Sequence, residues 1–354
     1  MEGKSFDIFG VSEFIGFEET KRFTPKVGLR GPKSRLLYLG FHERTENLPK
    51  LHISIVQYLN TAPLVWGFTN GPLRGKYQLS FTVPSLCAEA LRSGAVDIAI
   101  IPAVEYQRID ELVILPDLAI ASQNQVRSLL IVSKGPIESA RSIALDRSSR
   151  STQALTKILC DRQWKIAPEF FEMPPDADTM LQRADAALLI GDPALRLSIE
   201  IAASARRGRS REQVCPASSA GISGAETLHV YDVVEQWRKM TDLPAVLAVW
   251  AARPEVVSAE VVEDFQTSRD FGLKNVNEIS RRAAEELKLP AEELQRYLTE
   301  NIDFTLGVEN LRGLSAYFGL AAELGLIPGQ RAVTIAGQAY QPARSADLLI
   351  AKNH

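Results

Sequence analysis

The chain has 354 residues and a formal net charge of −3, with 45% hydrophobic and 23% charged residues. This composition is typical of a globular protein that is long enough for two lobes of ordinary domain size. The charge argues against a nucleic-acid surface, and no apolar run approaches the roughly 20 residues that a membrane span needs. We therefore expect neither nucleic acid nor a membrane as a partner.

Several kinds of site are excluded by the motifs that the sequence lacks. Cys87, Cys160 and Cys215 lie far apart and make neither a zinc-ligand spacing nor a disulfide framework. There is no nucleotide-binding glycine loop, nucleophile elbow or metal-binding constellation. We expect free thiols, no metal and no cofactor. The N-terminus has no apolar core behind a basic start, so we expect a cytoplasmic protein.

Residues 1–50 carry a mild basic cluster among glycines and prolines and are predicted to be a flexible extension. From residue 52 the pattern alternates between strands and helices. Strands are predicted over 53–56, 77–83, 96–101, 112–120, 127–133, 142–145, 169–173, 184–190 and 245–250. Helices are predicted over 63–68, 86–91, 153–160 and 231–240, and almost throughout 258–326 with a break at 301–305. Residues 203–225 are predicted to be a loop, and 331–354 a loosely attached tail.

Two apolar strands, 127–133 and 245–250, bracket a self-contained α/β segment. This order predicts an α/β, two-lobed clamshell with two crossing hinge strands. Lobe 1 would comprise residues 51–133 and 245–330, and lobe 2 would be the inserted residues 134–244. Such proteins bind ligands between the lobes and close by a hinge motion.

The best candidate site begins where the first strand ends. The apolar run 53–56 stops at polar residues that include Asn60 and Thr61, and Pro63 follows where a helix can start. In open α/β sheets ligands bind at such strand ends, and free N–H groups of a helix start attract anions. The alternative is an ordinary joint in which Asn60 or Thr61 caps the helix.

Other predicted strand and helix ends also carry small polar side chains, namely Ser85, Ser128, the run 148–152 and Asp192. Ser85 has an alternative role as a helix N-cap, the run 148–152 as a redundant N-cap in a serine-rich turn, and Asp192 as a turn residue before Pro193. Hydroxyl and N–H groups at helix starts suit a carboxylate or a phosphate. The residues favour a cleft that binds a small anionic molecule, and they leave open whether the protein is a binder or an enzyme.

The segment Tyr58-Leu-Asn-Thr-Ala-Pro-Leu64 resembles the Tyr-Leu-Asn-Thr-x-Pro-Leu signature of the chorismate dehydratase family, the first enzymes of the futalosine route to menaquinone. Pro102-Ala-Val-Glu-Tyr106 and Ile190-Gly-Asp192 with Ala194-Leu195 are similar to further family motifs. The other similar segments are 84–85, 91–97, 126–128, 149–152, 248–251 and 301–307. Residues 122–126 depart from the family, which usually has Gly-Pro before Val126. The resemblance runs from about residue 52 to about residue 327.

The resemblance implies a type II periplasmic-binding-protein-like fold that serves as a lyase without a cofactor. The implied reaction converts chorismate to 3-(1-carboxyvinyloxy)benzoate and water. In this hypothesis the enolpyruvyl carboxylate of the substrate takes the ring proton, and Asn60 is the catalytic residue that holds that carboxylate or the departing hydroxyl. The substrate-binding residues would be Thr61, Ser85, Ser128, Ser149, Ser151, Thr152 and Asp192.

Three alternatives remain at this point. The sister enzyme of the pathway, 1,4-dihydroxy-6-naphthoate synthase, shares the fold but lacks the Tyr-Leu-Asn-Thr element. A solute-binding receptor for a small carboxylate needs export, for which the sequence shows no signal. A ligand-sensing regulatory domain would be expected beside a DNA-binding module, and none accompanies the clamshell.

Overall fold

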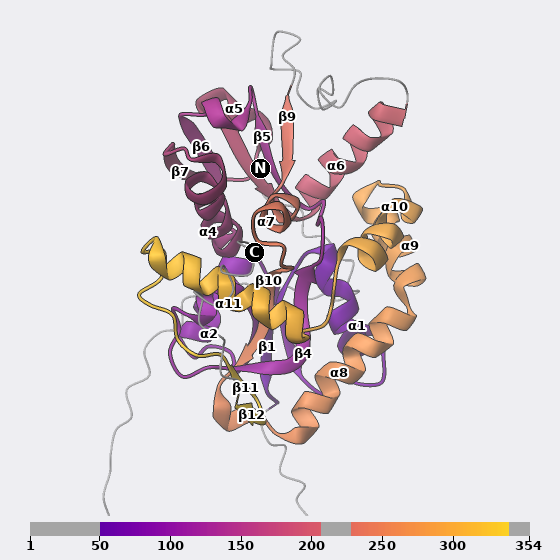
Figure 1. The fold of residues 1–354 in the computed structure, drawn as a ribbon. Helices are drawn as coiled ribbons and strands as arrows, with labels where there is room; N and C mark the ends of the chain where they lie inside the picture. The colour runs from indigo at the N-terminus through magenta and orange to yellow at the C-terminus, as the bar shows by residue number, and fades with distance from the viewer. Residues whose placement is uncertain (1–49, 207–227, 340–354) are drawn as a thin grey trace, which may run out of the picture.

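A computed structural model describes residues 50–206 and 228–339, and they form two α/β lobes, each built on one sheet (Figure 1). The predicted α/β class with two lobes is confirmed. No helix in these two ranges is long and apolar enough to cross a membrane. The predictions for residues 1–49, 207–227 and 340–354 lie outside the described residues.

The larger sheet has seven strands in the order β12-β11-β4-β10-β3-β1-β2. Its strands are β1 (His52–Val56), β2 (Gln78–Thr82), β3 (Ile98–Pro102), β4 (Val113–Ser122), β10 (Ala245–Ala252), β11 (Thr334–Ile335) and β12 (Gln338–Ala339). β1 pairs in parallel with both β2 and β3, whereas β10 runs antiparallel to β3 and β4. β3 is buried along its whole length, as its uninterrupted apolar sequence predicts.

The helices of this lobe are α1 (Ala62–Asn70), α2 (Pro84–Arg92), α3 (Ala103–Tyr106), α8 (Ala259–Lys274), α9 (Val276–Leu287), α10 (Ala291–Arg296) and α11 (Val308–Glu323). α1 and α8 touch backbone to backbone. A Cβ atom at Gly272 would lie 1.9 Å from the carbonyl oxygen of Pro63. Ser268 completes the contact, because its Oγ accepts the Gly67 N–H at 3.1 Å and donates to the Leu64 carbonyl at 2.8 Å. This contact fixes the start of α1.

The smaller sheet has five strands in the order β7-β6-β8-β5-β9. Its strands are β5 (Leu129–Ser133), β6 (Ser142–Asp146), β7 (Glu169–Met173), β8 (Ala186–Ile190) and β9 (His229–Asp232). β6 is parallel to β7 and β8, and β5 is antiparallel to β8 and β9. Its helices are α4 (Arg150–Leu159), α5 (Ala177–Arg183), α6 (Gly191–Arg206) and α7 (Val233–Thr241).

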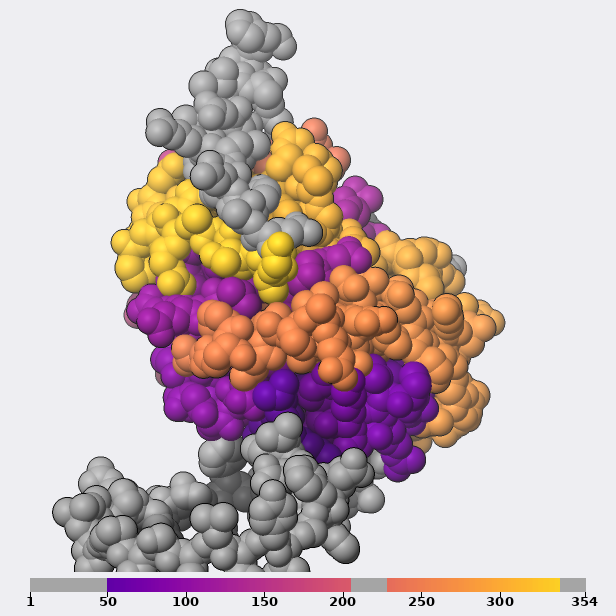
Figure 2. Space-filling model, turned by 90° about the horizontal axis from the view of Figure 1, so that it is seen from below, coloured from indigo at the N-terminus to yellow at the C-terminus, as the bar shows by residue number. Residues whose placement is uncertain are grey.

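The structure corrects the predicted lobe boundary at residue 133. β5 belongs to the smaller sheet, because it pairs with β8 from Leu129↔Ile190 to Ser133↔Ala186. The first crossing between the lobes is therefore residues 123–128, and the second is residues 242–244, between α7 and β10. We call the lobe with the larger sheet lobe 1 and the other lobe 2. Figure 2 shows early residues (indigo and magenta) and late residues (orange and yellow) forming one face of the molecule.

Several further elements differ from the prediction, and α5 and β9 were not predicted at all. α4 begins at Arg150 rather than at residue 153. Gly191-Asp192-Pro193 opens helix α6 instead of forming a turn, since proline is tolerated in a first helical turn. Residues 331–339 are docked rather than loose: Arg331 donates to the Ile109 carbonyl at 2.7 Å, and β11 joins the edge of the larger sheet beside β4.

Candidate active site

The three parallel strands of lobe 1 end at the interface with lobe 2. Their carboxyl ends share one edge of the sheet, which is where open α/β sheets bind ligands. The chain that leaves each strand donates one backbone N–H to lobe 2: Leu59 to Asp192 Oδ1 at 3.2 Å, Ser85 to the Ser148 carbonyl at 3.2 Å, and Val104 to Ser151 Oγ at 3.2 Å. Predicted site residues of both lobes thus meet along this edge.

Asn60 lies in a single 3-10 turn, η1 (Leu59–Thr61), between β1 and α1. Thr61 occupies the N-cap position of α1, but no side chain there makes a capping hydrogen bond. The Thr61 hydroxyl lies 3.5 Å from Asn60 Oδ1 instead. Thr61 thus holds the N-cap position that the alternative predicted, but neither side chain makes the capping hydrogen bond.

Tyr297 is a neighbour of Asn60 that the sequence did not reveal. It begins η6 (Tyr297–Asn301), a π-helical turn of the kind that is frequent at functional sites. Its buried hydroxyl donates to Ser128 Oγ at 2.9 Å and also bonds the Asn60 side chain. Burial raises the pKa of the Tyr297 phenol, so its proton stays in place at neutral pH. A buried tyrosine at helical spacing looks like core, and only the nearby break in the helical run hinted at a special turn.

Asp192 stands in the first turn of α6 and faces the Asn60 turn. Burial raises the pKa of this carboxyl to about 7, although the Leu59 N–H lowers it. The negative charge of Glu286 adds to the rise, and Arg196 opposes it. The helix start would favour the ionised form, but desolvation is the larger effect. Asp192 therefore takes up a proton more readily than an exposed carboxyl group, and its Oδ1 accepts the Leu59 N–H.

The backbone conformation and close packing at position 191 explain why a glycine precedes Asp192. Its φ is +68°, and a Cβ there would lie 2.8 Å from the ring of Tyr58. The Gly191 N–H donates to the Ser128 carbonyl at 2.8 Å, and the Tyr58 hydroxyl lies 3.5 Å from Ser148 Oγ. The aromatic ring from lobe 1 therefore packs on the start of α6 in lobe 2.

The serine-rich segment 148–152 is ordered by its own hydrogen bonds. Ser148 donates from its N–H and its hydroxyl to Asp146 Oδ1, at 2.9 and 2.7 Å. Ser149 occupies the N-cap position of α4, but its side chain makes no capping hydrogen bond to the backbone. Its hydroxyl donates to Thr152 Oγ1 at 2.8 Å instead. The Ser151 carbonyl accepts the Tyr317 hydroxyl at 3.0 Å. Sequence reasoning did not identify Asp146, which orders this segment by accepting the two hydrogen bonds from Ser148.

Ser85 is half-buried and is the second residue of α2, because Val83 takes the N-cap position. Its alternative role as the N-cap of that helix is therefore wrong. Ser85 stays beside the serine-rich segment through its N–H bond to Ser148. No group of three His, Cys, Asp or Glu within residues 50–206 and 228–339 is arranged to hold a metal ion.

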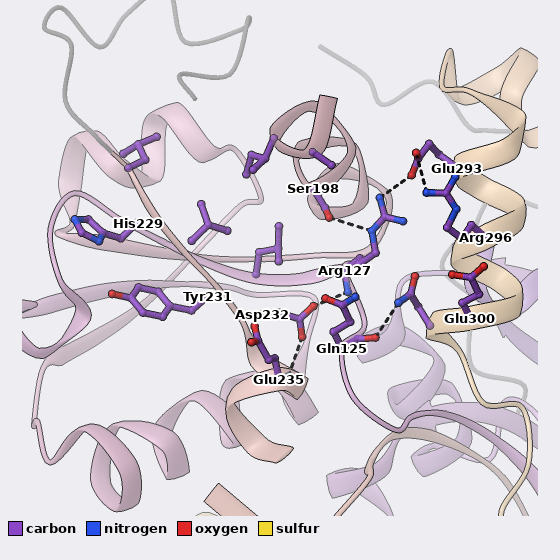
Figure 3. A pocket seen from close by; sticks show the side chains of 16 residues that line it. Gln125, Arg127, Ser198, His229, Tyr231, Asp232, Glu235, Glu293, Arg296 and Glu300 are labelled. Atoms are coloured by element: carbon purple, nitrogen blue, oxygen red, sulfur yellow. Dashed lines mark hydrogen bonds and ion pairs between the residues drawn. The ribbon is translucent and has the colours of Figure 1, made fainter. Parts of the chain in front are cut away.

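A cavity of about 610 Å³ is lined by residues of the first crossing and of α6, β9 and α10 (Figure 3). Arg127 reaches across it, donating to Ser198 Oγ at 3.3 Å and pairing with Glu293 at 3.0 Å. None of the predicted site residues lines this cavity. Arg127, Glu293 and Arg296 pair with one another there, and the predicted residues meet elsewhere, so we assign the candidate site to the strand ends around Asn60.

Comparison with known proteins agrees with the fold and with the motifs. The model of the menaquinone biosynthesis family matches residues 51–323. A chorismate dehydratase of Thermus thermophilus is 28% identical over 276 residues, which cover 77% of this chain and 95% of that protein.

Solved structures with a similar fold include periplasmic binding proteins. A protein from Archaeoglobus fulgidus has a TM-score of 0.58 at 20% identity, with 78% of this chain and 98% of that chain covered. The aliphatic sulphonate binding protein SsuA of Escherichia coli has a TM-score of 0.52 at 17% identity, with 83% and 92% covered. At these identities the likeness shows the fold alone. With most of its length matched by the family model, the chain belongs to the menaquinone biosynthesis family and has a periplasmic-binding-protein-like fold.

Proposed function

We propose that this protein is a chorismate dehydratase, a cytoplasmic lyase of the futalosine route to menaquinone. It removes water from chorismate and gives 3-(1-carboxyvinyloxy)benzoate. Two similarities support the proposal, the family match over residues 51–323 and the Thermus thermophilus relative. The observation that carries it is the position of the signature residue Asn60 at the strand end, bonded to Tyr297 and next to the Leu59 contact with Asp192.

The chemistry of the reaction suits a site of this composition. Chorismate carries two carboxylates, which match the hydroxyl and N–H groups at the starts of α2 and α4. Loss of water makes the ring aromatic, so the reaction has a large thermodynamic gain. The protein then needs mainly to hold the substrate in a reactive conformation and to stabilise developing negative charge.

In the proposed mechanism the enolpyruvyl carboxylate of the substrate removes the proton from the ring carbon that bears the enolpyruvyl ether. The electron pair of that C–H bond becomes the new ring double bond, and the bond from the neighbouring carbon to its hydroxyl breaks. The departing hydroxide takes up the proton that the carboxylate removed and leaves as water, so the carboxylate is ionised again in the product. Asn60 donates a hydrogen bond to the carboxylate or to the departing oxygen, and Asp192, which bonds the same turn through the Leu59 N–H, binds the substrate beside it.

The remaining predicted residues bind the substrate or support the residues that do. Ser85 from lobe 1 and the hydroxyls of Ser149, Ser151 and Thr152 from lobe 2 anchor the carboxylates, while Thr61 and Ser128 hold Asn60 and Tyr297 in place. The proposal places the substrate between the lobes, so each lobe supplies part of the site.

Incubation of the purified protein with chorismate tests the proposal. We expect chorismate to disappear and an aromatic product with the mass of chorismate minus water to form. A solute-binding protein would return chorismate unchanged, and that result would contradict the proposal.

A further inference from the structure

Glu105 belongs to the motif Pro102-Ala-Val-Glu-Tyr106. Its side chain takes no part in the proposed reaction, yet its carboxylate is fully buried. Three guanidinium groups surround it. Arg108 pairs with Oε1 at 2.8 Å, while Arg150, at 3.0 Å, and Arg92 both pair with Oε2. A buried carboxylate needs such partners, because an unpaired buried charge is strongly destabilising.

Arg150 is the member of this group that comes from lobe 2. Its other guanidinium nitrogen pairs with Glu89 of α2 at 2.7 Å, and Glu89 also pairs with Arg92 at 2.6 Å. One planar guanidinium from the start of α4 thus bridges two helices of lobe 1, α2 and α3, a geometry that lysine could not reproduce. In Figure 1 the start of α4 points down toward α2 and α11.

The residues on either side of Arg150 also bond to lobe 1. Ser151 accepts the Val104 N–H and the Tyr317 hydroxyl, and Ser148 accepts the Ser85 N–H. These neutral hydrogen bonds exist only while the lobes are closed. The ion pairs of Arg150 are the charged part of the same contact, and charge-assisted hydrogen bonds are the stronger kind.

We propose that Arg150 is a positioning residue that holds the two lobes closed and sets the Ser149–Thr152 segment against the substrate. The ion pairs with Glu89 and Glu105 form when α4 meets α2 and α3, so lobe closure and assembly of the site occur together. The part of this inference that concerns the substrate rests on the proposed function.

The charge of Arg150 can be removed without leaving a buried carboxylate unpaired. Glu105 keeps Arg92 and Arg108 when Arg150 is changed to Gln, and Glu89 keeps Arg92. Opening the lobes lowers the fraction of protein that is competent to bind, and the apparent affinity falls by that fraction. Saturating substrate restores closure, so KM rises while kcat stays near its original value.

Steady-state kinetics with chorismate give the first test. We expect Arg150→Gln to raise KM about 10- to 100-fold, the range of a charge-assisted hydrogen bond, and to change kcat by less than about twofold. Glu89→Gln should raise KM less, because Glu105 still holds Arg150. The matched control is Arg162→Gln, which removes the solvent-exposed pair of Arg162 with Glu323 of α11 and should leave KM unchanged. A fall in kcat at constant KM would overturn the proposal.

Amide hydrogen exchange on the substrate-free protein gives an independent test. The N–H groups of Ser85 and Val104 are bonded across the interface, so both should exchange faster in Arg150→Gln than in wild type and in Arg162→Gln. Unchanged exchange at both positions would refute the role of Arg150. If the wild type leaves chorismate unconverted, the proposed function fails and the exchange comparison alone decides this inference.

Discussion

Asp192 shows how burial and a helix start oppose each other at a single residue. Its folded-state pKa is raised to about 7 from the ordinary value of 3.8. Between these pH values the folded protein binds more protons than the unfolded chain. The contribution of Asp192 to stability is therefore fully present below about pH 4 and is lost as the pH rises through about 7.

We predict that Asp192→Asn flattens this pH dependence. A shift of one pKa unit is worth about 1.4 kcal/mol, so the half-buried Asp192 should cost the wild type about 2–4 kcal/mol between pH 4 and pH 8. Thermal or urea unfolding of both proteins across this range measures the difference. Parallel stability curves for the two proteins would contradict the assigned pKa.

At Tyr297 the prediction concerns one hydroxyl group. Tyr297→Phe keeps the buried ring and removes the bonds to Ser128 and Asn60. We expect kcat/KM for chorismate to fall about 3- to 15-fold, as the loss of a neutral hydrogen bond implies. Tyr77→Phe is the matched control, because its hydroxyl bonds Asp264 far from the interface and should not affect kcat/KM. Equal kcat/KM in Tyr297→Phe and wild type would exclude a role for this hydroxyl.

At the scale of elements, sequence reasoning worked where apolar runs are bounded by polar residues. β7 was predicted over the same residues that form it, 169–173, and β6 and β10 within two residues of their ends. α6 was missed because Gly191-Asp-Pro has the composition of a turn. The Asn60 turn was predicted because a strand end and a helix start are local patterns. Tyr297 and the partners of Arg150 were not, since those contacts join residues 45 or more positions apart.

The contact of α1 with α8 gives a prediction at this scale. Gly272→Ala would place a Cβ atom 1.9 Å from the Pro63 carbonyl oxygen, so the two helices must separate. Because Asn60 and Thr61 lead directly into α1, we expect kcat/KM to fall together with a loss of about 3 kcal/mol in the free energy of unfolding. Gly329→Ala is the control, because nothing lies within 4 Å of its added Cβ. Unchanged stability in Gly272→Ala would contradict the packing.

At the scale of the whole molecule, two short crossings connect the lobes, and the carboxylate of Asp232 fixes the first of them. Asp232 accepts the backbone N–H groups of Val126 at 3.0 Å and Arg127 at 2.6 Å in the first crossing. It also accepts those of Val234 and Glu235 at the start of α7, which leads to the second crossing. One carboxylate thus ties the first crossing to the start of α7, the helix that precedes the second crossing.

We propose above that Asn60, at the end of β1 between the lobes, carries the dehydration. The most direct measurement is kcat/KM for chorismate in Asn60→Ala and Asn60→Asp, with Asn70→Ala at the far end of α1 as the matched control. We predict a loss beyond roughly 100-fold in both Asn60 variants, as removal of one oriented donor implies, and little change in Asn70→Ala. Near wild-type kcat/KM in both Asn60 variants would show that Asn60 has no part in the dehydration.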